Sequence, residues 1–169
     1  TKKGVAPVAF RINENKAVIF DGAMGTMLQK RGLKRGEIPE LLNLTGPDII
    51  RSVHDEYFDA GCDVVSANTF GANRYKAEKA GRPLTDLVSS AVEIAKKAAS
   101  CRKGKYAALD IGPCGRVMQP TGDLPFEEAV EVFSEIVRAG TRAGADLILL
   151  ETFTDLYELK AALIAAKEN

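Results

Sequence analysis

Acidic side chains come directly after two apolar runs of this sequence. Asp21 follows the run AVIF at 17–20, and Glu151 follows the run DLILL at 146–150. A carboxylate at the end of a buried strand needs a partner for its charge, because an unpaired buried carboxylate is unfavourable. A cationic group on a ligand is one such partner, so the two acids could together bind an ammonium group.

Polar residues stand at the ends of two further apolar runs. Asn68 and Thr69 follow the run at 63–67, and Asp110 lies near the end of the run at 106–111. In parallel β/α folds the carboxyl ends of the strands form the ligand-binding face. If all four runs are strands of one parallel sheet, these polar side chains meet at the same rim.

Structural alternatives exist for the same residues. Asp21 could instead cap the helix that follows it, and Asp110 could be a structural acid in a turn that only redirects the chain. No helix-start signal accompanies Glu151, so a structural role is harder to assign to Glu151 than to the other two acids. Gly22 and Gly25 favour the binding interpretation, because glycine lets the backbone turn sharply and approach a ligand closely.

The elements that must position these residues alternate along the chain. The four apolar runs are nearly continuous, which is typical of parallel strands covered on both faces. Helical patterns fill the intervals at 46–61, 83–100, 124–144 and 155–169, and Thr85 is a candidate N-cap of the second. This β/α alternation predicts an α/β fold with a parallel sheet and right-handed crossovers.

Composition and missing motifs remove several classes of function. The 23 basic and 23 acidic residues balance, so charge gives no case for nucleic acid or a membrane surface as a partner. No apolar stretch approaches the roughly 20 residues of a membrane helix. The sequence has neither the glycine spacing of a dinucleotide site nor a P-loop. No lysine stands at a strand end, which argues against Schiff-base chemistry.

The cysteines and the single histidine carry little signal. Cys62, Cys101 and Cys114 form no C-x-x-C pair, which suits free thiols in a reducing cytoplasm. The N-terminus has no apolar segment typical of a secretory signal, so we expect a cytoplasmic protein. Cys114 alone lies near the expected ligand face, with no histidine to activate it. His54, within a helical pattern, is predicted to be solvated or half-buried.

Several motifs together resemble the homocysteine S-methyltransferase family. They are VIFDGAMGTMLQKRG from residue 18, ANTFGAN from residue 67, LDIGPCG from residue 109 and LILLETF from residue 147. The order and spacing are most similar to the N-terminal homocysteine module of the bacterial cobalamin-dependent branch, the methionine synthases. The resemblance covers nearly all of the chain from about residue 17 onward.

This resemblance implies a fold and a binding site. The family's domain is a (β/α)₈ TIM barrel, and residues 1–169 would be its N-terminal half, about four β/α units, with 1–16 as an extension. Asp21 and Glu151 would hold the amino group of homocysteine, and Gly22 and Thr69 would line the pocket. The implied reaction methylates the homocysteine thiol to give methionine, with no catalytic residue within this chain.

The resemblance also implies cofactors that other parts of the enzyme hold. Family members activate the thiol through zinc on three cysteines of the second half, and this chain's cysteines match none of those positions. Zinc lowers the pKa of a thiol. We therefore expect the zinc ligands beyond Asn169 and no metal on this chain, which alone would be inactive. The methyl donor would be methylcobalamin, carried and recharged by separate cobalamin and folate modules; other branches use S-methylmethionine or betaine.

A second interpretation is a non-catalytic β/α scaffold or an engineered half-barrel. The pattern at 155–169 shows no C-cap signal, which favours a truncated enzyme domain. Half a barrel leaves its first and fourth strands as bare edges. We therefore expect the fragment to self-associate or to rearrange so that those edges are covered.

Overall fold

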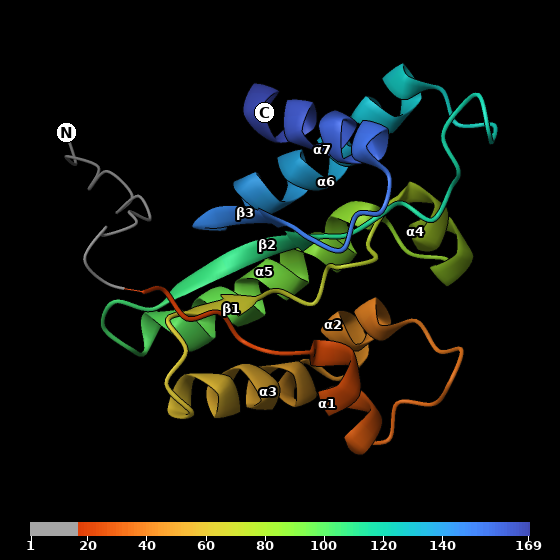
Figure 1. Cartoon of the computed structure of the whole chain (residues 1–169). Coiled ribbons are helices and arrows are strands. Elements are labelled where there is room, and N and C mark those ends of the chain that lie inside the picture. Colours follow the sequence, from red (N-terminus) through yellow and green to blue (C-terminus); the bar gives the residue numbers. More distant parts are fainter. Residues whose placement is uncertain (1–16) are drawn as a thin grey trace, which may run out of the picture.

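The computed structural model describes residues 17–169, so the predicted extension 1–16 lies outside the described residues. Three strands, β1 (Val64–Ser66), β2 (Tyr106–Ile111) and β3 (Leu147–Leu150), form one parallel sheet in the order β1-β2-β3 (Figure 1). In register, Ser66 lies opposite Ala108, and Asp110 lies opposite Leu149. The sheet is open, and with its helices it confirms the predicted α/β class with parallel strands and a partial barrel.

The first expected strand, 17–20, is shorter in the structure than predicted. Only Phe20 forms a parallel bridge, with Val64 of β1. The carbonyl of Ile19 accepts a hydrogen bond from the N–H of Val64 at 3.2 Å, and the N–H of Asp21 donates to the carbonyl of Val64 at 3.0 Å. The segment thus lies along β1, but within the described residues no strand covers its other side. Ile19 is accordingly 57% exposed.

Helices occupy all four intervals in which the sequence predicts them. These are α3 (Pro47–Asp59), α5 (Leu84–Ser100), α6 (Phe126–Arg142) and α7 (Leu156–Glu168). Shorter helical segments, which the sequence analysis did not predict, are α1 (Met24–Lys30), η1 (Pro39–Leu41), α2 (Leu42–Thr45) and α4 (Arg74–Ala80). Within residues 17–169, no helix combines the length and the apolar character needed to cross a membrane.

Thr85 is not the N-cap of α5, contrary to the prediction. The helix begins at Leu84, and the capping position belongs to Pro83, whose backbone is extended with ψ 136°. Thr85 therefore lies in the first helical turn and is exposed. The reason is that the fixed φ of proline already sets the entry of the chain into the helix.

The core lies between the sheet and the helices that pack on it. Leu109 of β2 and Phe133 of α6 are fully buried and belong to the same apolar cluster. Gly140 of α6 lets that helix approach β2, because a Cβ there would lie 2.4 Å from Leu109 Cδ2. Side chains alternate along a strand, so Leu109 faces the helices while Asp110 faces the opposite side of the sheet.

His54 is fully buried, which corrects the prediction of a solvated or half-buried side chain. Neither ring nitrogen has a hydrogen-bond partner among the described residues. Burial lowers the pKa of the imidazole to about 4, because it disfavours the charged form, so His54 is neutral near pH 7. The prediction failed because α3 is packed against both α5 and the unforeseen α1, which widens its buried face.

We predict that Leu109→Ala lowers the free energy of unfolding by about 2–5 kcal/mol, because it removes a fully buried side chain and leaves a cavity. Urea unfolding would measure this. Leu163→Ala is the matched control, since Leu163 of α7 is 45% exposed, and a smaller change of about 0.5 kcal/mol is expected. Equal effects of the two substitutions would contradict the assignment of Leu109 to the core.

The β3 side of the sheet leads to a second prediction. All four residues of β3 are only partly buried, and within the described residues β3 pairs with β2 alone. Leu156 and Tyr157, just beyond it, are 80% and 59% exposed. We expect the chain to self-associate through this edge, as light scattering would detect. A monomer with strong hydrogen-exchange protection in every strand would contradict this expectation.

Candidate functional site

A pocket of about 680 Å³ opens at the carboxyl ends of the strands. Three acids from successive segments of the sheet line it: Asp21 after the bridge to β1, Asp110 in β2, and Glu151 after β3. The structure therefore brings together Asp21 and Glu151, which the sequence analysis placed at one rim. It adds Asp110, which that analysis left open between a ligand-facing and a structural role.

Asp21 is held in place by Ser66 of β1. One carboxylate oxygen accepts the backbone N–H of Ser66 at 2.9 Å, and the other accepts its hydroxyl at 2.8 Å. Burial raises the pKa of Asp21 to about 6; the Ser66 hydrogen bonds act against this, and the charge of Glu151 adds to it. Asp21 does not cap α1, because the N-cap position there belongs to Ala23.

Asp110 is the most buried of the three acids. Its side chain faces the pocket side of β2, and the residue is only 6% exposed. Its Oδ1 atom has no hydrogen-bond partner among the described residues. Burial, together with the nearby charges of Glu151 and Asp21 and a side-chain hydrogen bond with Glu151, raises the pKa of Asp110 to about 8, so the carboxyl group holds a proton near pH 7.

Glu151 is exposed at the pocket mouth. Its backbone N–H donates to the carbonyl of Ile111 at 3.1 Å, which extends the pairing of β2 and β3 by one residue. Thr152 then adopts φ 60°, a left-handed conformation that a β-branched residue rarely adopts. The chain thus turns away immediately after Glu151, and the strained turn fixes where this acid leaves the strand.

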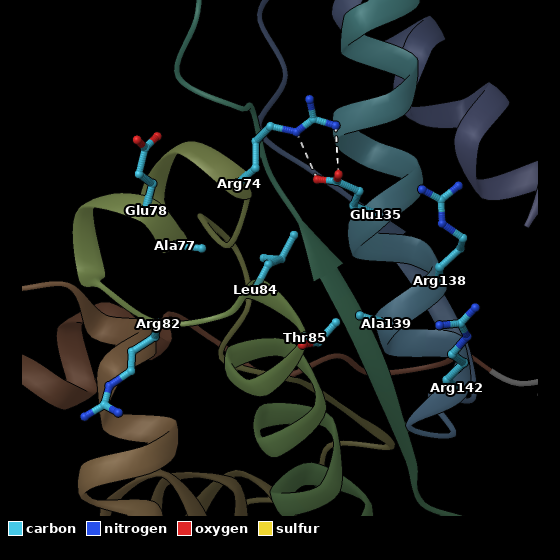
Figure 2. A pocket seen from close by; sticks show the side chains of 10 residues that line it. All are labelled: Arg74, Ala77, Glu78, Arg82, Leu84, Thr85, Glu135, Arg138, Ala139 and Arg142. Carbon is cyan, nitrogen blue, oxygen red and sulfur yellow. Dashed lines mark hydrogen bonds and ion pairs between the residues drawn. The ribbon is translucent and has the colours of Figure 1, made fainter.

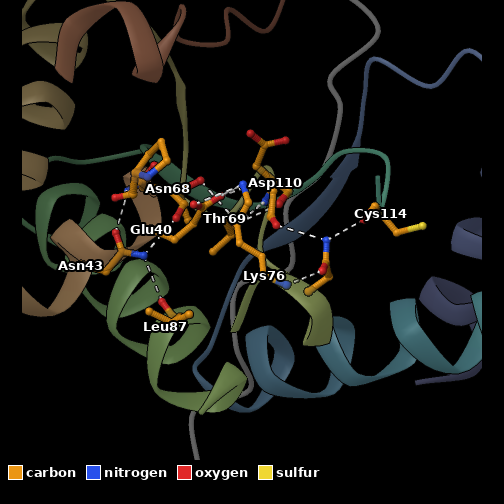
Figure 3. Close-up of polar contacts among 12 residues, drawn as sticks. Glu40, Asn43, Asn68, Thr69, Lys76, Leu87, Asp110 and Cys114 are labelled. Atoms are coloured by element: carbon orange, nitrogen blue, oxygen red, sulfur yellow. Dashed lines mark hydrogen bonds and ion pairs between the residues drawn. The ribbon is translucent and has the colours of Figure 1, made fainter. Parts of the chain in front are cut away.

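The predicted site residue Thr69 lies behind the pocket wall. It is fully buried, and its hydroxyl donates to the carbonyl of Asp110 at 2.7 Å and accepts the N–H of Asp110 at 3.2 Å (Figure 3). The flanking residues Asn68 and Phe70 line the pocket instead. Thr69 therefore holds the backbone of Asp110, and a direct contact of Thr69 with substrate remains a prediction.

Two glycines in or beside the pocket lie against aromatic side chains. Gly22 lines the pocket as predicted, but a Cβ on it would lie 2.9 Å from the hydroxyl of Tyr57, so its close neighbour is this side chain. A Cβ on Gly112 would lie 2.4 Å from the ring of Phe70. Gly25, which the sequence analysis also linked to ligand approach, lies within α1 and lines the pocket there.

A buried polar network that the sequence analysis missed supports the rim (Figure 3). Glu40 is only 2% exposed and accepts hydrogen bonds from the N–H of Gly71 at 3.0 Å and from Lys76 Nζ at 3.1 Å. Asn43 donates to the carbonyl of Asn68 at 3.0 Å. The sequence analysis singled out neither Glu40 nor Asn43, because periodicity did not indicate that they are buried.

The cysteines do not form a metal or nucleophilic site. All three are free thiols, and burial raises the pKa of Cys62 to about 11 and that of Cys114 to about 12. Both thiols are thus protonated and unreactive near pH 7. In the part of the chain that the structure describes, no group of histidine, cysteine and acidic side chains is arranged to hold a metal ion. The residues present do not fit zinc.

A second hollow, of about 440 Å³, lies between α4, the start of α5, and α6 (Figure 2). Arg74 makes a bidentate contact with Glu135 at its edge, with distances of 3.0 and 2.8 Å. Arg82 points away from α6 in Figure 2, so the arginines of this hollow do not converge on a common point. None of the predicted site residues lies here.

We predict that the chain loses stability as pH rises from 6.5 to 8. The pKa of Asp110 is raised on folding, so its stabilising contribution is complete at low pH and is lost as pH approaches about 8. The expected loss is about 1–2 kcal/mol over this window. Asp21 titrates mostly below it, and His54, with its lowered pKa, acts in the opposite direction mainly below pH 6.5.

Urea unfolding at several pH values would measure this slope. Asp110→Asn should flatten it between pH 6.5 and 8. Asp86→Asn, which changes an exposed acid of α5 outside the pocket, should leave it intact. An unchanged slope in the Asp110 variant would show that Asp110 does not titrate near pH 8.

Comparison with characterised proteins gives consistent relatives. A sequence model described as homocysteine S-methyltransferase matches residues 18–169. The methionine synthase of Mycobacterium tuberculosis is 33% identical over 165 residues, a match that covers 90% of this chain and 14% of the relative. The methionine synthase of Mycobacterium leprae is 31% identical over 168 residues, with the same coverage. The chain thus spans about 14% of the length of these relatives.

Solved structures agree with this match. The oxidized form of the homocysteine methyltransferase MmuM from Escherichia coli superposes with a TM-score of 0.77 at 25% identity, over 89% of this chain and 58% of that chain. Its metallated form superposes with a TM-score of 0.78 at 24% identity, over 90% of this chain and 60% of that chain, which supports the fold. The chain therefore belongs to the homocysteine S-methyltransferase family, as its motifs predicted.

Proposed function

We propose that this chain binds the amino-acid end of homocysteine for a homocysteine S-methyltransferase of the methionine synthase type. In this proposal Asp21 and Glu151 accept hydrogen bonds from the substrate ammonium group. Gly22 and Thr69 shape the adjoining wall, Gly22 at the pocket surface and Thr69 through the backbone of Asp110. The complete enzyme transfers a methyl group to the homocysteine thiol and so forms methionine.

One observation carries the proposal: acids from separate segments share a pocket in which no protein cation is available to them. Lys76 is the one basic side chain among the described residues that line the pocket, and it is paired with Glu40 at 3.1 Å. Among residues 17–169, the acids therefore have no free basic side chain in the pocket lining as a partner. An ammonium group supplies that charge, and charge-assisted hydrogen bonds to carboxylates are the stronger ones.

The thiol chemistry belongs to groups outside the described residues in this proposal. Zinc, when bound by a family member, lowers the pKa of the substrate thiol and makes it a nucleophile. One solved relative is described as metallated, whereas Cys62 and Cys114 here are protonated, and the described residues hold no cluster of metal-binding side chains. We propose methylcobalamin as the methyl donor, delivered by cobalamin and folate modules, because the methionine synthases are among the relatives. This chain's own residues bind and orient the amino end.

We predict that Asp21→Asn and Glu151→Gln each weaken the binding of L-homocysteine to the chain. Losing a hydrogen bond between charged groups is worth about 1.5–3 kcal/mol, which corresponds to roughly 10- to 100-fold in Kd. Isothermal titration calorimetry would measure the affinities, with urea unfolding to establish that each variant is folded.

Two controls separate recognition of the ammonium group from general damage. The analogue 4-mercaptobutanoate has the thiol and carboxylate but no ammonium group, so its affinity should change little in either variant. Asp86→Asn removes an exposed acid outside the pocket and should leave homocysteine binding unchanged. If both pocket variants bind homocysteine as tightly as the parent chain, the proposed roles of Asp21 and Glu151 are wrong.

A further inference from the structure

Asp110 differs from its two acidic neighbours in having a buried carboxyl oxygen without a hydrogen-bond partner among the described residues. Asp21 already receives two hydrogen bonds from Ser66, and Glu151 is exposed to water. Asp110 is only 6% exposed, yet its Oδ1 atom has no hydrogen-bond partner among the described residues. A buried polar atom without a partner is unfavourable by about 1–3 kcal/mol. Because Asp110 lines the pocket, a ligand group that donates a hydrogen bond could complete this atom.

The position of Asp110 specifies which group that is. β2 is the middle strand, so Asp110 lies between the segment that carries Asp21 and the strand that carries Glu151. Both neighbours act on its carboxyl group electrostatically. The remaining charged groups that line the pocket, Glu40 and Lys76, neutralise each other. A ligand group that donates a hydrogen bond to Oδ1 and carries positive charge would both complete this atom and offset the charges of Asp21 and Glu151.

We propose that Asp110 is a third substrate-positioning carboxyl group, whose Oδ1 accepts a hydrogen bond from the ammonium group of the bound amino acid. This inference rests on the proposed function and deepens it, because the family resemblance assigned the ammonium group to Asp21 and Glu151 alone. The three N–H bonds of an ammonium group can then each face one acid. The backbone of Asp110 is already fixed for this task by Thr69.

In this proposal, binding of the ammonium group is coupled to the release of a proton from Asp110. In the free chain near neutral pH, Asp110 holds a proton, as its raised pKa requires. When the ammonium group binds, the proton leaves the Asp110 carboxyl group for the buffer, and the resulting carboxylate pairs with the cation. No proton leaves the ligand. Affinity should therefore rise with pH up to about 8, whereas Asp21, with a pKa of about 6, affects only the lower part of this range.

Calorimetry of L-homocysteine binding at pH 7.5 in phosphate and in Tris tests the inference, because the two buffers differ in ionisation enthalpy. The parent chain should release roughly half a proton or more for each ligand bound. Asp110→Asn should release close to none, and its affinity should no longer rise between pH 6.5 and 8. Asp86→Asn should behave as the parent. The Asp110 variant should bind 4-mercaptobutanoate like the parent, which would establish that its pocket is intact.

The outcomes separate this inference from the function on which it rests. If the parent chain does not bind homocysteine, the proposed function and the inference both fail. If the parent binds homocysteine but releases no proton, or if Asp110→Asn releases as many protons as the parent, the inference alone is overturned. Asp110→Ser is a second variant without a carboxyl group, and it should reproduce the lost proton release if the effect belongs to the acid.

Discussion

Mutual repulsion of carboxyl groups at the carboxyl ends of the strands is the constraint on which this structure depends. Asp21, Asp110 and Glu151 share one pocket, and each of the first two feels the charge of Glu151. Like charges that are partly withdrawn from water raise one another's pKa values. Two hydrogen bonds from Ser66 stabilise the carboxylate of Asp21, and Asp110 avoids a second buried charge by keeping its proton. In the proposed function, a cationic group of the ligand relieves this repulsion.

The frame behind the acids consists of polar side chains that bond to backbone. Thr69 clamps both backbone groups of Asp110, Asn43 and Asn68 bond to each other at 2.9 Å, and Glu40 holds the N–H of Gly71. Each contact joins a loop at the rim to a neighbouring strand or helix and so restrains that loop. This explains why the ANTFGAN stretch is rich in short polar residues: nearly every one of them has a structural partner.

The sequence predicted β1, β2, β3 and the acids that follow apolar runs because those features are local, whereas the expected strand at 17–20 is reduced to a single bridge. The run at 106–111 coincides with β2, and Asp21 and Glu151 follow apolar runs that the parallel sheet aligns. Burial of His54 and Glu40 was not predicted, because it depends on α1 and η1, two short segments with little periodicity. The unpartnered Oδ1 of Asp110 could not be predicted either, since partners are a property of three-dimensional neighbours.

The contact between Gly112 and Phe70 determines the aperture of the pocket. The Phe70 ring, 42% exposed, occupies the space that a side chain at position 112 would need. Any larger residue there would displace the aromatic ring, and because Phe70 itself lines the pocket, the entrance would change shape with it. The shape of the pocket entrance thus depends on a residue that has no side chain and that lies outside the pocket lining.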